Sequence, residues 1–225
     1  MFHAKSQFDM TRPRVKICCI SSIEEAKLAV AYGASALGLV GHMPSGPGVI
    51  DDALIAEIAR TVPPPVASFL LTSQQQVSGI VEHYQRVHTT TIQIVDELEN
   101  RDYRALRQAL PHVKLVQVIH VQNEQSVEEA LAISQLVDAL LLDSGSPNKA
   151  VKELGGTGRV HDWSLSRQIV QQSAVPVFLA GGLRPDNVKA AIDAVQPFGL
   201  DLCSGVRTNG QLDEGKLAAF FQAIE

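Results

Sequence analysis

Short apolar runs alternate with amphipathic segments along almost the whole chain. The apolar runs are rich in β-branched residues and have the length of strands. Eight of them can be recognised, over residues 15–20, 36–41, 65–72, 90–95, 114–121, 139–145, 176–182 and 199–205. Each is followed by a segment with the apolar spacing of a helix, so the sequence predicts eight strand–helix units.

This alternation predicts the fold class. Near-continuous apolar strands separated by helices are typical of a parallel sheet whose outer face is covered. Eight such units in a chain of 225 residues fit a single α/β domain, a (β/α)8 TIM barrel, over residues 15–225. A doubly wound open sheet is the alternative. Residues 1–14 precede the first strand and lack the apolar core of a secretory signal, so we expect an N-terminal tail there.

The first predicted helix has boundary signals at both ends. Ser22 and Glu25 have the spacing of a capping box, in which two side chains satisfy amides at the start of a helix. Gly33 is a plausible C-terminal stop. A helix is therefore expected between these residues.

Composition and charge restrict the function. Hydrophobic residues make up 45% and charged residues 19% of the chain, which predicts a folded domain with a sizeable core. The net charge is −5 without a basic cluster, which argues against a nucleic-acid partner. No apolar run approaches the roughly 20 residues that span a bilayer, so no membrane partner is expected. Three cysteines are too few for a disulfide framework, and a reducing cytoplasm is the expected location.

Glycine-rich segments indicate where a ligand binds. In a TIM barrel the chemistry lies at the C-terminal ends of the strands, and the loops after strands seven and eight usually bind phosphate. Here these loops are LAGGLRPDNV (179–188) and DLCSGVRTNG (201–210), and GGTG (155–158) follows strand six. Such glycines could simply end strands, but three clusters favour a phosphate-bearing ligand. The predicted phosphate-binding residues are Gly156, Gly181, Gly182, Ser204 and Gly205.

Several motifs carry a resemblance to a known family. KICCIS (16–21) is similar to a Lys-Ile-Cys-Gly-Ile-Thr motif, and GASALGLV (33–40), LLLDS (140–144), GGTGRVHDW (155–163) and the last two glycine-rich segments also match. Together they resemble phosphoribosylanthranilate isomerase, a cofactor-free (β/α)8 enzyme of tryptophan biosynthesis. The resemblance implies an Amadori rearrangement of N-(5-phosphoribosyl)anthranilate to the 1-deoxyribulose 5-phosphate product, and it implies no cofactor. The seven histidines likewise show no pairing at metal-ligand spacing.

The resemblance also implies two catalytic residues. In the family, a carboxylic acid protonates the ribose ring oxygen and a cysteine thiolate removes the C2′ proton, which places the acid at Asp143 and the base at Cys18. Alternation of side chains along a strand independently points Cys18 and Asp143 into the barrel and Cys19 toward the helices. The alternatives are an inert buried thiol at Cys18 and a capping role for Asp143. A thiol acts as a base only when it is partly ionised.

The same alternation places three other polar residues inside the barrel. Lys16 on strand one and Asp201 on strand eight would be neighbours, and we interpret them as a structural ion pair. Cys203 also has inward parity and would lie close to Cys18. The barrel interior is thus expected to carry charge and thiols just below its mouth.

The sequence departs from the family pattern on the side that binds the anthranilate. The family has an arginine in the loop after strand two that binds the carboxylate, and Gly48 stands near that place. His42 or Arg207 could replace it, although Arg207 could equally be a solvated surface charge. Strand four ends in Val95-Asp96 instead of a His-Gly pair. An isomerase or epimerase of another phosphosugar, or a non-catalytic phosphometabolite-binding barrel, therefore stays open. In each case we expect a small-molecule phosphosugar partner and a monomer or homodimer.

Overall fold

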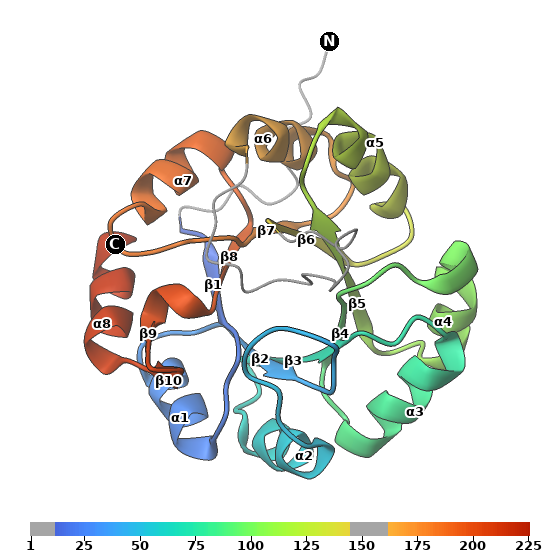
Figure 1. Cartoon of the computed structure of the whole chain (residues 1–225), viewed down its shortest axis with the longest axis horizontal. Coiled ribbons are helices and arrows are strands. Elements are labelled where there is room, and N and C mark those ends of the chain that lie inside the picture. The colour runs from blue at the N-terminus through green and yellow to red at the C-terminus, as the bar shows by residue number, and fades with distance from the viewer. Residues whose placement is uncertain (1–11, 145–161) are drawn as a thin grey trace.

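The strands form one closed parallel barrel in a computed structural model that describes residues 12–144 and 162–225. In Figure 1 the strands lie at the centre and the helices form a ring around them. The strands are β1 Arg14–Ile17, β2 Ala36–Val40, β3 Ala67–Thr72, β4 Thr91–Ile94, β5 Lys114–His120, β6 Ala139–Asp143, β7 Val177–Leu179 and β8 Gly199–Leu202. Since β8 pairs with β1, with Asp201 opposite Lys16, the barrel is closed and the predicted TIM barrel is confirmed over the open sheet.

A helix follows each strand, as the apolar spacing predicts. The helices are α1 Ile23–Ala31, α2 Asp52–Thr61, α3 Val77–Val87, α4 Tyr103–Ala109, α5 Glu124–Ile133, α6 Trp163–Gln172, α7 Val188–Val195 and α8 Glu214–Ala223. Short 3-10 turns, η1 Glu99–Arg101 and η2 Ser204–Val206, and a hairpin of β9 Arg207–Thr208 with β10 Gln211–Leu212 were not anticipated. None of the helices in the described ranges is long and apolar enough to cross a membrane.

The start of α1 follows the predicted boundary signals with one difference. The Ser22 hydroxyl accepts a hydrogen bond from the Glu25 amide at 3.1 Å, and Gly33 follows the end of the helix with a φ of +103°. The Glu25 carboxylate reaches back to the amide of Ser21, at 3.0 Å, and not to that of Ser22. Glu25 is thereby held beside the turn that follows β1.

Two apolar layers follow from the alternation of side chains. On β5, Leu115 and Ile119 belong to the layer between strands and helices, whereas Val116 and Val118 fill the barrel interior. On β1, Ile17 likewise faces the helices and Cys18 belongs to the interior cluster. The parity argument that points Cys18 inward is therefore confirmed.

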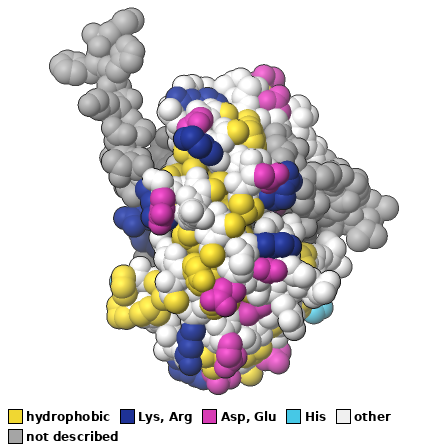
Figure 2. Space-filling model, turned by 90° about the vertical axis from the view of Figure 1, so that its left-hand side faces the viewer, with side chains coloured by type: hydrophobic (Ala, Val, Ile, Leu, Met, Phe, Trp, Pro, Cys, Tyr) yellow, Lys and Arg dark blue, Asp and Glu magenta, His cyan; other side chains and the backbone are white. Residues whose placement is uncertain are grey.

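The surface mixes the two signs of charge on the face that Figure 2 shows. Lys and Arg side chains lie among Asp and Glu, with hydrophobic side chains between them. Neither sign gathers into a large patch on this face. The predicted N-terminal tail lies almost entirely outside the described residues and stays a prediction.

Candidate active site

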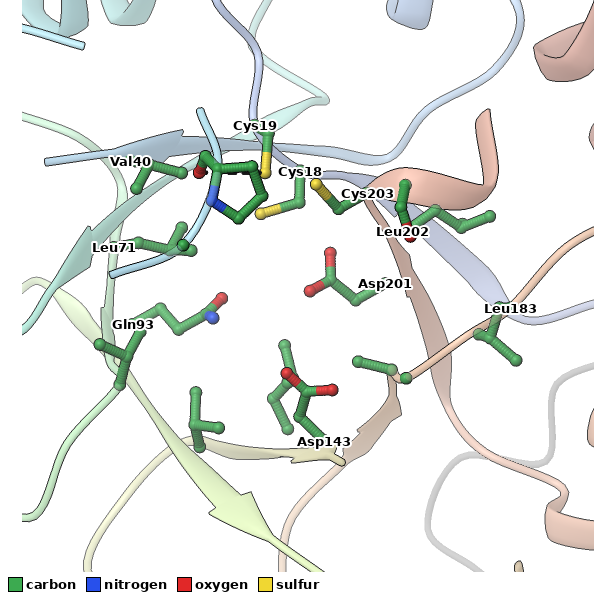
Figure 3. A pocket seen from close by; sticks show the side chains of 18 of the residues that line it. Cys18, Cys19, Val40, Leu71, Gln93, Asp143, Leu183, Asp201, Leu202 and Cys203 are labelled. Atoms are coloured by element: carbon green, nitrogen blue, oxygen red, sulfur yellow. Dashed lines mark hydrogen bonds between the residues drawn. The ribbon is translucent and has the colours of Figure 1, made fainter. Parts of the chain in front are cut away.

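A pocket with an empty volume of about 710 Å³ lies at the C-terminal ends of the strands (Figure 3). This is the end at which TIM barrels carry their chemistry. Its lining includes Cys18, Cys19, Val40, Met43, Leu71, Gln93, Val95, Asp143, Gly181, Gly182, Asp201, Cys203, Ser204 and Gly205. Six of the nine predicted site residues thus meet in one cavity although they come from β1, β6, β7 and β8.

The predicted base, Cys18, lies directly after β1 and is buried. Its amide donates to the Leu202 carbonyl of β8 at 2.7 Å, which fixes its place at the barrel wall. Gly38 on β2 leaves room for the thiol, because a Cβ atom there would lie 2.8 Å from the Cys18 Sγ. The neighbouring Cys19 thiol and the positive charge of Lys16 lower the pKa of Cys18 against the effect of burial. The ionisation that a thiol base needs is therefore favoured here.

The buried ion pair predicted from parity is present one layer below Cys18. The Lys16 Nζ lies 2.8 Å from an Asp201 carboxylate oxygen, and Lys16 is completely buried. The ammonium also lies 5.4 Å from the centre of the Phe69 ring. Burial alone would lower the pKa of Lys16, but the charge of Asp201 raises it above its ordinary value. Lys16 therefore stays charged beneath the pocket and favours a thiolate at Cys18.

Cys19 differs from the expectation that it faces the helix layer. Strand β1 ends at Ile17, and Cys19 adopts a left-handed conformation with a φ of +63°. This conformation breaks the alternation of the strand, and the side chain lines the pocket with its Sγ 3.7 Å from the Pro47 carbonyl oxygen. The neighbouring thiols of Cys18 and Cys203, together with burial, raise the pKa of Cys19 well above its ordinary value. Cys19 therefore stays protonated beside Cys18, and its thiol donates to the Pro47 carbonyl.

The loop between β2 and α2 packs directly on Cys19. Gly48 has a φ of +79°, and a Cβ atom at this position would lie 2.5 Å from the Cys19 Cβ. The Cα atom of Cys19 would also lie 2.9 Å away, so position 48 has no room for a side chain. Met43 and Pro47 of this loop line the pocket, whereas His42 is exposed and is not among the described residues of the lining. The geometry does not favour the predicted contact of His42 with a ligand.

The predicted acid, Asp143, ends β6 and lines the pocket. The side chain is buried, and its Oδ1 accepts a hydrogen bond from the Ser144 amide at 2.7 Å. Burial raises the pKa of Asp143, and the Ser144 amide and nearby His120 on β5 only partly offset this. The protonated form that a general acid needs is therefore favoured.

Two glycine-rich loops meet on one side of the pocket. Gly181 and Gly182 have φ values of +87° and +63°, which glycine adopts without strain. A Cβ atom on Gly205 would overlap the Leu183 carbonyl oxygen, so only glycine allows the loops after β7 and β8 to approach this closely. Among the described residues, no carbonyl accepts a hydrogen bond from the amides of Gly182, Ser204 or Gly205. The third predicted loop, with Gly156, lies outside the described residues.

Arg207 differs from both sequence interpretations. The residue is only 8% exposed, so it is not a solvated surface charge. Its guanidinium pairs with both oxygens of Glu25, at 2.9 and 3.0 Å, and donates to the carbonyls of Cys18 and Cys19 at 3.2 and 2.6 Å. Arg207 is not among the described lining residues, and its two terminal nitrogens donate to protein groups, whereas its buried Nε has no partner among the described residues. The geometry therefore does not favour Arg207 as a clamp for a ligand carboxylate.

Gln93 was missed by the sequence analysis. Its side chain comes from β4, is 3% exposed and projects into the pocket opposite Asp201 (Figure 3). The Oε1 atom is buried and has no hydrogen-bond partner among the described residues. A polar residue at an inward position of a buried strand was the only available signal. No group of three or more His, Cys, Asp or Glu side chains in the described part of the chain is arranged to hold a metal ion.

Fold and site together define a class of protein. A closed (β/α)8 barrel in which a thiol with a lowered pKa and a carboxyl with a raised pKa line the same pocket has the features of an enzyme that uses acid–base catalysis. The chain matches the family described as N-(5'-phosphoribosyl)anthranilate (PRA) isomerase over residues 15–223. It therefore belongs to the PRA isomerase family.

Individual relatives agree with this assignment. N-(5'-phosphoribosyl)anthranilate isomerase 2 of Methanosarcina mazei is 36% identical over 212 residues, which cover 92% of each chain. The solved PRA isomerase of Thermotoga maritima superposes with a TM-score of 0.80 at 29% identity, covering 94% of this chain and 98% of the other. A further PRA isomerase structure, in complex with reduced 1-(o-carboxyphenylamino)-1-deoxyribulose 5-phosphate, has a TM-score of 0.75 at 27% identity and the same coverage. The resemblance inferred from the motifs is confirmed: the enzyme is a PRA isomerase of tryptophan biosynthesis.

Proposed function

We propose that this enzyme carries out the Amadori rearrangement with Cys18 as the base and Asp143 as the acid. The observation that carries the proposal is that both side chains line one pocket and have pKa values shifted in opposite directions. The pKa of Cys18 is lowered and that of Asp143 is raised, so more molecules hold a thiolate and a carboxylic acid at the same pH. That combination is the active state for this reaction.

The two side chains act in sequence. Asp143 donates its proton to the ribose ring oxygen, the bond between this oxygen and C1′ breaks, and the nitrogen lone pair forms a Schiff base. The Cys18 thiolate then removes the proton from C2′, and the electron pair moves to give an enolamine. Tautomerisation of the enolamine yields the ketone. Lys16, charged and buried below Cys18, stabilises the thiolate between turnovers.

The phosphate of the substrate is assigned to the loops after β7 and β8. Gly181, Gly182, Ser204 and Gly205 line the pocket there, and three of these amides lack a carbonyl partner among the described residues. Clustered amides without internal partners suit an anion. Gly156 would join them from the loop after β6.

Gln93 is assigned to a hydroxyl group of the sugar. The carboxamide is buried on the pocket wall, and its Oε1 has no partner among the described residues. A hydroxyl both donates and accepts, so it can pair with either end of the amide. Ribose carries hydroxyls on the carbon atoms next to the reacting one.

The aromatic ring of the substrate is assigned to the apolar wall of the pocket. Val40, Met43, Leu71 and Val95 give this part of the pocket an apolar surface, which suits an aryl group better than a second sugar. The alternative, an isomerase of a phosphosugar without an aromatic group, would leave this wall unused. The apolar wall therefore favours anthranilate although no arginine stands at position 48.

Two broader expectations accompany this proposal. The enzyme of T. maritima is dimeric, and we expect the present chain to be a monomer or a homodimer, which analytical ultracentrifugation distinguishes. Cys18, Cys19 and Cys203 are free thiols, and we expect the enzyme to work in a reducing cytoplasm.

A turnover assay tests the proposed function. Purified enzyme should convert PRA, followed by anthraniloyl fluorescence, and its gene should rescue a tryptophan auxotroph that lacks this isomerase. Absence of both activities in a folded protein that still binds a phosphosugar would contradict the proposal. Turnover of a non-aromatic phosphosugar instead would support the alternative.

A further inference from the structure

Arg207 and Glu25 form a nearly buried pair next to the predicted base. Their side chains are 6% and 13% exposed, and the guanidinium meets both carboxylate oxygens, at 2.9 and 3.0 Å. Glu25 holds the pKa of Arg207 above its ordinary value, although burial opposes this. The pair is therefore a rigid, charged anchor and not a mobile surface contact.

The anchor connects the turn after β1 and the start of α1 with the β9–β10 hairpin, which is distant from them in the sequence. The Glu25 carboxylate accepts hydrogen bonds from the amide of Ser21, at 3.0 Å, and from the amide of Leu212, at 2.7 Å. Arg207 also donates to the Gly210 carbonyl at 2.9 Å. The turn after β1, the start of α1 and the β9–β10 hairpin after β8 are thereby held together.

The same guanidinium fixes the backbone on both sides of Cys19. It donates to the carbonyl of Cys19 at 2.6 Å and to that of Cys18 at 3.2 Å. Successive carbonyls of a strand point in opposite directions, so one donor reaches both only where the strand geometry is broken. The φ of +63° at Cys19 is such a break, and it is also what turns the Cys19 thiol into the pocket.

We propose that Arg207, held by Glu25, is a positioning residue that keeps the Cys18–Cys19 backbone in the geometry that turns the Cys19 thiol into the pocket beside Cys18. This inference rests on the proposed role of Cys18 as the base. Arg207 itself does not touch the substrate in this scheme. It acts through the two carbonyls and leaves phosphate binding to the glycine-rich loops.

Four charged or titratable groups set the ionisation of Cys18 around this anchor. Lys16 approaches from β1, Asp201 from β8, Cys19 from the turn itself, and Arg207 acts through the backbone. Loss of Arg207 leaves Lys16 and Asp201 in place. A change in the reactivity of Cys18 is therefore attributed to a changed backbone geometry in the turn after β1. The pH optimum of a reaction that needs one base and one acid lies midway between their two pKa values, so a less stabilised thiolate moves the optimum upward.

The test compares Arg207 variants with a matched arginine at the other end of the barrel. The variants are Arg207→Met/Glu25→Gln, which removes both charges, and Arg207→Lys, which keeps the charge but has no planar fork. Arg107 is the control because it also donates to a carbonyl, of Val113 at 3.0 Å, and pairs with a carboxylate, of Asp138 at 2.6 Å. The measurements are kcat and KM against pH, and the pH dependence of Cys18 alkylation by iodoacetamide, located by mass spectrometry.

The double variant should lose kcat by about 10- to 100-fold with a nearly unchanged KM, because a small displacement of the Cys18 thiolate from the C2′ proton slows the reaction without affecting substrate binding. Its pH optimum and the alkylation profile of Cys18 should move to higher pH. Arg207→Lys should fall between the double variant and wild type, and it provides the test if the double variant does not fold. Arg107→Met should lower the melting temperature and leave kcat and both profiles unchanged.

Two outcomes separate the possible failures. Wild-type kcat and wild-type Cys18 alkylation in the Arg207 variants, with only a lower melting temperature, would overturn the positioning role. Full turnover by Cys18→Ala would refute the proposed base instead. The alkylation profile would still report whether Arg207 controls the thiol, because it does not depend on turnover.

Discussion

Cys19 determines how the three thiols are arranged at the barrel mouth. Its left-handed backbone brings the side chain beside Cys18 and below Pro47, where a regular strand would have placed it among the helices. A left-handed residue with a Cβ costs about 1–2 kcal/mol, which glycine avoids. The conformation is therefore maintained against a local cost by the surrounding contacts.

This cost can be measured with two substitutions that both remove the thiol. Cys19→Gly and Cys19→Ala lose the same sulfur atom, but only alanine retains the strained Cβ. We expect Cys19→Gly to be more stable than Cys19→Ala by about 1 kcal/mol, the reverse of their order in a helix. Urea denaturation measures the difference. Equal stabilities, or a more stable alanine variant, would show that the backbone at position 19 relaxes.

The same pair of variants tests how Cys18 is ionised. The Cys19 thiol lowers the pKa of Cys18, so its removal should raise this pKa and leave that of Asp143 unchanged. The pH optimum lies midway between the pKa values of Cys18 and Asp143, so it should move to higher pH in both variants. A pH–rate profile of kcat/KM measures the shift. An optimum that stays in place or moves down would contradict a donor role for Cys19.

At the scale of elements, the loops after β7 and β8 form one unit. Gly205 in η2 approaches the Leu183 carbonyl so closely that no other residue type fits between the loops. The glycine-rich pattern in the sequence thus reflects contact between two loops as well as turn geometry. Phosphate affinity should depend on this contact.

Gly205→Ala tests the contact against a glycine in an ordinary helix. The added methyl group must push the loops apart, so we expect KM for PRA to rise about tenfold or more, with a loss of stability of about 1–3 kcal/mol. Gly215→Ala is the control, because a Cβ there would lie 3.4 Å from its nearest neighbour, the Oδ1 atom of Asp213, which caps α8. That variant should keep the wild-type KM and gain about 0.5–1 kcal/mol. Steady-state kinetics and urea denaturation give both values, and an unchanged KM in Gly205→Ala would contradict the shared phosphate site.

At the scale of the whole molecule, strand and helix patterns were sufficient to predict the closed barrel and the inward side chains of regular strands. Lys16 belongs to this group, and Cys18, directly after the end of β1, continues the same alternation. The prediction that Cys19 faces the helices was wrong, because a single left-handed residue cannot be recognised in a hydrophobic pattern. The burial of Arg207 could not be predicted either. It depends on Glu25, 182 positions away, and on a hairpin of two-residue strands that the hydrophobic pattern does not reveal.

Barrel closure is what makes the chemistry possible in this account. It brings Cys18, from the first strand, and Asp143, from the sixth, to the same mouth, and neither strand could assemble the pair alone. A substrate between them meets the thiolate and the acid from different sides. The central claim is therefore that Asp143 protonates the ring oxygen and Cys18 removes the C2′ proton.

The most direct measurement is the turnover of PRA by Cys18→Ala and Asp143→Asn, each paired with the affinity for the reduced product analogue. Loss of a general base or acid costs about 100- to 10,000-fold in rate, so we expect kcat to fall into this range in both variants. The affinity should stay within a few-fold of wild type, because the glycine-rich loops that would hold the phosphate are unchanged. A kcat close to the wild-type value in either variant would contradict the assignment of that residue.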